Sequence, residues 1–96
     1  NEPGYYESGW GGIRLENLYV VRKAEGYQEH PAGKGWLCFE TLTLIPFDRR
    51  LIDRNILSPD EVKWLDEYHS LVLREISPLL ENTQDVHWLK WACGAE

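Results

Sequence analysis

Residues 13–23, Ile-Arg-Leu-Glu-Asn-Leu-Tyr-Val-Val-Arg-Lys, decide how this chain folds. They are rich in β-branched, aromatic and aliphatic side chains, which predicts one strand over the whole segment. Side chains alternate between the two faces of a strand, so Arg14 and Glu16 share a face. A carboxylate on a mainly apolar strand needs a compensating partner. Glu16 is therefore the first candidate for a functional residue.

The segment before this strand predicts its partner. Residues 2–6, Glu-Pro-Gly-Tyr-Tyr, predict a short strand, and residues 7–12 contain three glycines and a serine, which indicate a turn. If the two strands pair as a hairpin, four side chains can meet on one of its faces. These are Glu2, Tyr6, Arg14 and Glu16.

The segment after it predicts a loop and another strand. Residues 24–35 are polar and contain three glycines and a proline, so we expect an exposed loop. Residues 36–47 predict a third strand, which Pro46 should end or hold at a sheet edge. Residues 48–57 predict a connector with one helical turn.

Two helices are predicted in the last third of the chain. Residues 58–61, Ser-Pro-Asp-Glu, are typical of a helix start, with the serine as N-cap and the glutamate closing a capping box. Apolar residues then recur at helical spacing until Pro78 ends the helix. A last helix is expected from Asn82 or Thr83 up to Gly94, a plausible C-cap.

The order of these elements predicts an α+β chain, in which antiparallel strands are followed by two C-terminal helices. We expect a strand region over residues 1–47 and a helical region over residues 48–96. Ninety-six residues amount to one domain or less. The chain contains no methionine, so we expect Asn1 to be a processed position or a position within a longer protein.

Composition excludes several classes of partner and site. The formal net charge of −6 argues against a nucleic-acid backbone and against an anionic membrane surface. No apolar run is long enough to span a bilayer. Cys38 and Cys93 lie far apart and form no CxxC pair, which favours reduced thiols and a cytoplasmic protein.

Two carboxylates on neighbouring strands have three interpretations. Glu2 and Glu16 could bind hard divalent ions, because carboxylate oxygens suit Mn, Mg and Ca and also Zn. They could act as an acid and a base. They could also be ordinary exposed strand residues, which spacing alone favours.

Three stretches together resemble a known family. They are Glu-Pro-Gly-Tyr-Tyr at residues 2–6, Gly-Ile-Arg-Leu-Glu-Asn at residues 12–17, and Phe-Glu-Thr-Leu-Thr-Leu-Ile-Pro at residues 39–46. With Trp-Leu-Asp-Glu-Tyr-His at residues 64–69, they resemble the C-terminal part of Xaa-Pro aminopeptidases (aminopeptidase P), which are pita-bread metallopeptidases. The resemblance covers essentially the whole chain.

The resemblance implies a reaction and a set of ligands. Such enzymes remove an N-terminal residue that precedes proline, and they use two divalent ions, commonly Mn or Zn, held by two Asp, one His and two Glu. Glu2 would bind one metal and Glu16 would bridge both. Arg14 would orient Glu16 and balance its charge, and Tyr6 would line the site.

The other family ligands precede the segment that matches Glu2 and are missing from this sequence. Two glutamates cannot satisfy two divalent ions, each of which takes about four to six ligands. We therefore expect the isolated chain to be inactive and to hold no metal stably. The alternative is a non-catalytic binding or dimerisation module, and we expect a homo-oligomer. Four tryptophans, at positions 36, 64, 88 and 91, are expected in the core, or some of them exposed where the preceding part of the enzyme is missing.

Overall fold

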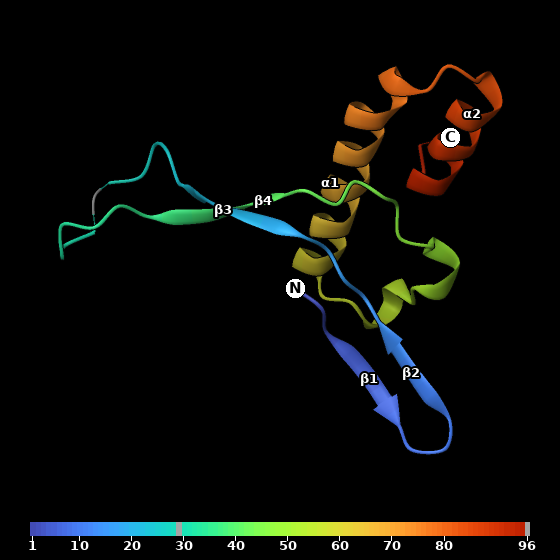
Figure 1. Cartoon of the computed structure of the whole chain (residues 1–96), viewed down its shortest axis with the longest axis horizontal. Helices are drawn as coiled ribbons and strands as arrows, with labels where there is room; N and C mark the ends of the chain where they lie inside the picture. The colour runs from blue at the N-terminus through green and yellow to red at the C-terminus, as the bar shows by residue number, and fades with distance from the viewer. Residues whose placement is uncertain (29, 96) are drawn as a thin grey trace. The chain divides into compact units, whose positions relative to one another are not determined.

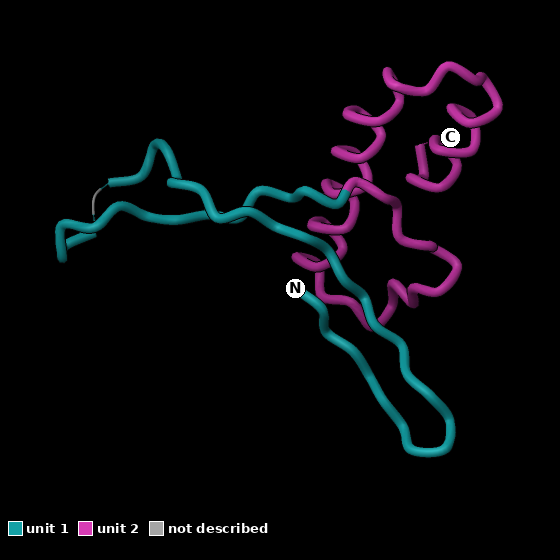
Figure 2. Tube along the Cα trace, in the orientation of Figure 1, with its two compact units in different colours: residues 1–43 teal, residues 44–96 magenta. Residues whose placement is uncertain are grey.

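A computed structural model describes residues 1–28 and 30–95 of the chain. It divides into two compact units, residues 1–43 (unit 1) and residues 44–96 (unit 2), shown in two colours in Figure 2. The described residues form two small antiparallel sheets and two α-helices, which confirms the predicted α+β class. The predicted division at residue 47 concerns the domains of a longer enzyme and stays a prediction.

Unit 1 consists of two β-hairpins that follow one another along the chain (Figure 1). In the first, β1 (Gly4–Glu7) pairs with β2 (Gly11–Arg14). In the second, β3 (Tyr19–Lys23) pairs with β4 (Leu37–Thr41). Within the described residues the two hairpins do not pair with each other, so each sheet has two strands.

The prediction of one strand over residues 13–23 was wrong, because this segment changes partner along its length. Residues 11–14 pair with β1, and the ladder continues as the Leu15 amide donates to the Pro3 carbonyl. Past Asn17 the pairing passes to the other hairpin, where the Leu42 amide donates to the Leu18 carbonyl. The extended segment therefore serves two sheets.

The third strand is shorter than residues 36–47. β4 ends at Thr41, five residues before Pro46. The Leu18 amide donates to Thr43 Oγ1 (2.9 Å), so a side chain rather than the backbone ladder satisfies it. Residues 44–47 belong to unit 2, where Leu44 and Phe47 pack against the core.

The two helices confirm their predictions. α1 spans Pro59–Ile76, with Ser58 as N-cap and both bonds of a capping box formed with Glu61. α2 spans Thr83–Cys93, begins after the N-cap Asn82, and ends at Gly94 in the left-handed conformation. The predicted helical turn in the connector is present as two 3₁₀ turns, η1 (Arg49–Leu51) and η2 (Arg54–Ile56), and η3 (Ser77–Leu79) follows α1.

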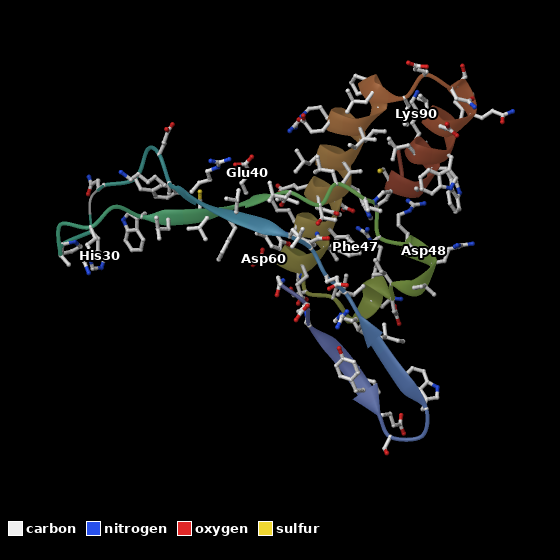
Figure 3. All side chains as sticks on the ribbon, viewed as in Figure 1. His30, Glu40, Phe47, Asp48, Asp60 and Lys90 are labelled. Carbon is white, nitrogen blue, oxygen red and sulfur yellow. The ribbon has the colours of Figure 1, made fainter. Side chains whose placement is uncertain are left out.

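The core of unit 2 lies between α1 and α2. Tyr68, Val72 and Leu89 are buried together, and partly buried residues from both helices and from residues 44–47 pack against them. Two hydrogen bonds tie that segment to α1. The Tyr68 hydroxyl donates to the Ile45 carbonyl (2.6 Å), and the Phe47 amide donates to His69 Nε2 (3.1 Å). Figure 3 shows Phe47 beside α1.

The tryptophans do not lie in the core, and their exposure agrees with the alternative expectation. The four are between 42% and 57% exposed, at positions 36, 64, 88 and 91. Trp64 stacks on Tyr68 with the two ring planes 6° from parallel, so Tyr68 covers one face of the tryptophan ring. Among the described residues, every buried apolar side chain lies in unit 2, and unit 1 buries only Asn17.

Candidate metal centre

The register of the first hairpin places the two candidate glutamates opposite each other. Gly4 pairs with Arg14 and Tyr6 with Gly12. Beyond the assigned strands, the Asn17 amide donates to the Asn1 carbonyl (3.1 Å), which continues the same register. Glu2 therefore lies directly across from Glu16.

The hydrogen-bond pattern brings this pair of side chains close. The Asn1 amine also donates to the Asn17 carbonyl (3.2 Å), so residues 1 and 17 exchange both bonds. Hydrogen-bonded and non-hydrogen-bonded pairs alternate along an antiparallel ladder. Glu2 and Glu16 therefore form a non-hydrogen-bonded pair, in which Cβ atoms typically lie about 4.5–5.5 Å apart.

The charges on this face are only partly balanced. Like charges directly opposite each other destabilise a sheet. Arg14 shares the face, and its Nη2 lies 3.4 Å from Glu16 Oε1, a long contact between half-exposed groups. Such an exposed pair is worth about 0–1 kcal/mol. Arg14 is therefore only a weak charge partner for Glu16.

All four predicted site residues share this face of the hairpin. Tyr6 lies on it next to Arg14 and is largely exposed, as are Glu2 and Glu16. Their roles as ligands, charge partner and site lining stay predictions. Within residues 1–28 and 30–95, no three His, Cys, Asp or Glu side chains gather into a group that could hold a metal.

Asn17 was not singled out from the sequence, although it follows Glu16 directly. It is 7% exposed, and its Nδ2 is buried without a hydrogen-bond partner. A buried polar atom left unpaired costs about 1–3 kcal/mol. Only its polar character within an apolar run could have drawn attention to it.

A separate hollow of about 130 Å³ lies in unit 2 between residues 46–50 and α2. Its acidic group is already paired, because Arg50 makes two bonds to the Asp48 carboxylate, at 2.9 and 2.6 Å. These bonds lower the pKa of Asp48 to about 2. Arg50 also lies over the Trp91 ring, 5.7 Å from its centre. The hollow thus offers no carboxylate that lacks a partner.

His69 is the one buried histidine of the described residues, and it has a structural role as the acceptor for the Phe47 amide. Burial is the main cause that lowers its pKa, and Arg49 lowers it further, while the Asp66 carboxylate acts in the opposite direction. The neutral ring can accept the bond from the Phe47 amide at Nε2. His30 and His87 are exposed.

Known proteins match most of this chain. Residues 35–95 match the family described as the C-terminal region of peptidase M24. Aminopeptidase P1 of Lotus japonicus is 44% identical over 92 residues, which are 96% of this chain. Aminopeptidase P2 of Arabidopsis thaliana is 46% identical over 89 residues (93%), and a probable Xaa-Pro aminopeptidase P of Coprinopsis cinerea is 43% identical over 91 residues (94%).

The matched part is small in each relative. This chain spans 14% of the Lotus and Coprinopsis proteins and 12% of the Arabidopsis protein. In the described part of the chain, neither helix is long and apolar enough to cross a membrane. The matches confirm the resemblance to aminopeptidase P that the motifs indicated. The chain therefore belongs to the peptidase M24 family, whose C-terminal region it carries.

Proposed function

We propose that this chain is the C-terminal part of a longer, metal-dependent Xaa-Pro aminopeptidase, which removes the N-terminal residue of peptides whose second residue is proline. In that parent enzyme, Glu2 and Glu16 are two of five metal ligands. The observation that carries the proposal is the placement of these two carboxylates opposite each other, with Arg14 in a long contact to Glu16.

The residues on the hairpin suit a pair of divalent ions such as Mn or Zn. Both glutamates present hard oxygen donors, and the adjacent Arg14 can hold Glu16 in one orientation. When bound, the metal pair supplies Lewis-acid activation of water and of the scissile carbonyl. Tyr6 lines the same face and can donate a hydrogen bond to a bound peptide.

We propose that the isolated chain is inactive and holds no metal stably. Two glutamates provide fewer oxygen donors than two divalent ions require, because each ion takes about four to six ligands. The missing donors would come from the preceding part of the parent. Free thiols at Cys38 and Cys93 are consistent with a cytoplasmic parent.

The test is Glu16→Gln in the full-length parent, which keeps the shape of the side chain and removes its charge. We expect the kcat/KM for a Xaa-Pro peptide to fall about 100-fold or more, because even changes beside a metal ligand typically cost 10–100-fold. Metal content, measured by mass spectrometry, should fall with it. Glu7→Gln is the matched control, since Glu7 lies in the same hairpin on the other face.

Full activity and full metal content of the Glu16→Gln parent would contradict the ligand role. An equal loss in the Glu7→Gln control would indicate a general defect of the hairpin instead.

A second function, subunit contact, is favoured by the exposed tryptophans of unit 2. Trp88 and Trp91 lie on α2, 57% and 42% exposed, and no predicted ligand requires them. We propose that this region contributes to a homo-oligomer, either beside catalysis or, in the alternative, as a non-catalytic dimerisation module. Light scattering on the parent decides this, because a monomer at all concentrations excludes the contact.

A further inference from the structure

We propose that Gly4 and Gly12 are positioning residues for Tyr6: they leave the room in which its ring lies flat on the hairpin, so that its hydroxyl points toward the Glu2–Glu16 end of the face. The inference rests on the proposed function, because it assigns Tyr6 a place beside the metal ligands. The inference adds Gly4 and Gly12 to the site, although neither residue has a charged or hydrogen-bonding side chain.

The ring of Tyr6 occupies the space that side chains at both glycines would fill. A Cβ built on Gly4 would lie 2.7 Å from the Tyr6 hydroxyl oxygen and 2.8 Å from Cζ. A Cβ on Gly12 would lie 2.8 Å from Cε1 and would overlap Cδ1 still more. Contacts under 3.0 Å are essentially never seen for real Cβ atoms. The base of the ring therefore lies over Gly12 and its tip over Gly4.

Backbone conformation does not explain these two glycines. The glycines with positive φ in the described residues are at positions 9, 11, 26, 33 and 94, and neither Gly4 nor Gly12 is among them. Glycine within a strand is destabilising relative to alanine, and it often marks a place where another group approaches closely. Here the approaching group is the Tyr6 ring.

The register gives the direction of the ring. Gly4 pairs with Arg14, and Glu2 and Glu16 form the next pair on the same face. Because the hydroxyl lies over Gly4, it is displaced from its own Cα toward that pair. Two residues along a strand span about 7 Å, so the backbone of the Glu2–Glu16 pair lies about one such step beyond Gly4. It can donate a hydrogen bond to a group bound beside them.

The two glycines act on different parts of the ring. At Gly4 the overlap is with the tip, which a small rotation of the side chain can relieve. At Gly12 the overlap is with the base, and a Cβ there would also lie 3.3 Å from the Tyr5 carbonyl oxygen. A side chain at Gly12 must therefore displace the whole ring, and we expect it to have the larger effect.

A purely structural role is the competing explanation. An aromatic ring over a glycine in a sheet also recovers stability, without any part in catalysis. The two explanations differ in what Gly12→Ala does once Tyr6 has been removed. A positioning residue that acts through Tyr6 has nothing left to position.

The experiment is a double-mutant cycle in the full-length parent: Gly12→Ala, Tyr6→Ala and the double variant, assayed for kcat and KM with a Xaa-Pro peptide. We expect Gly12→Ala to lower kcat about 10- to 100-fold in the otherwise unchanged enzyme, because small misplacements of catalytic groups cost this much. In the Tyr6→Ala background it should change kcat less than about 2-fold. Metal content should stay unchanged throughout.

Two variants complete the design. Gly35→Ala is the matched control, because its Cβ would meet no atom within 4 Å and its φ is not positive, so its activity should be unchanged. Gly4→Ala repeats the cycle with the milder overlap, and it decides the question if Gly12→Ala does not fold.

Each outcome has one meaning. An equal loss of kcat with and without Tyr6 overturns the inference, as does loss of metal from the glycine variants, which would indicate a direct effect on the ligands. If the unmodified parent does not cleave Xaa-Pro peptides, the proposed function itself has failed. Cleavage by the unmodified parent together with coupling between Gly12 and Tyr6 establishes both.

Discussion

The two units differ in how far they bury their own apolar side chains. Unit 2 buries apolar residues of two helices against each other, whereas unit 1 leaves most apolar side chains of its hairpins exposed. A two-stranded hairpin alone is marginally stable in water, and stability needs more strands or a packed face. The comparison indicates that unit 2 holds its own fold, and that the candidate site lies in the part that depends on additional structure.

The two faces of the second hairpin carry different kinds of side chain. Val21 lies across from Phe39 and Lys23 across from Leu37, so side chains of these residues share one face. Phe39 and Leu37 are mostly exposed there. On the other face, Arg22 pairs with Glu40. One face is thus mainly apolar apart from Lys23, whereas the other carries an ion pair.

The largest test of this comparison replaces a leucine in each unit. Leu89 is 3% exposed in the core of unit 2, and Leu37 is 66% exposed on β4. Leu89→Ala should lower the free energy of unfolding by about 2–5 kcal/mol, because it leaves a cavity. Leu37→Ala should change it by less than about 0.5 kcal/mol. Urea unfolding, followed by helical circular dichroism, measures both. Equal costs would contradict the difference between the units.

A smaller effect is expected at the start of α1. Ser58→Ala removes the hydroxyl that accepts from the Glu61 amide and should cost about 1 kcal/mol of stability. Ser58→Asp is the control, because aspartate caps helices as well as serine does. The same unfolding measurement applies. A loss with both variants would show that the position matters for some reason other than capping.

The smallest expected effect is a pH dependence of unit 2 alone. The pKa of His69 is lowered in the folded chain, mainly by burial and then by Arg49. The unfolded chain therefore binds this proton more readily, and stability should fall as the pH drops below about 6.5. His69→Gln can still accept from the Phe47 amide and should flatten the dependence between pH 5 and pH 6.5 (roughly the histidine range). An unchanged slope would exclude His69 as its source.

The sequence predicted the elements of unit 2 better than those of unit 1, because the residues that start and end the helices of unit 2 lie within a few positions of those ends. The capping box at residues 58–61, the stop at Pro78 and the C-cap at Gly94 each specify their element within a few residues, and all are present. Local pattern could not divide residues 13–23, since that division depends on hydrogen bonds to residues 1–7 and 37–42.

The candidate site was predictable in one respect and not in another. Alternation along the strands predicted that Glu2, Tyr6, Arg14 and Glu16 share a face, and the register places them there. The position of the Tyr6 ring over Gly4 and Gly12 was not predictable, because a glycine in a strand does not reveal which group will occupy the space beside it. The burial of Asn17 also depends on contacts that the sequence does not specify.

The bond from the Phe47 amide to His69 also has a consequence for hydrogen–deuterium exchange. Phe47 belongs to no helix or strand, so its amide would ordinarily exchange quickly. Here the acceptor is a buried ring nitrogen on α1, and the amide is released only when that part of unit 2 opens. Slow deuterium uptake at Phe47, matching the interior of α1, would make this single position a reporter for opening of the helical unit.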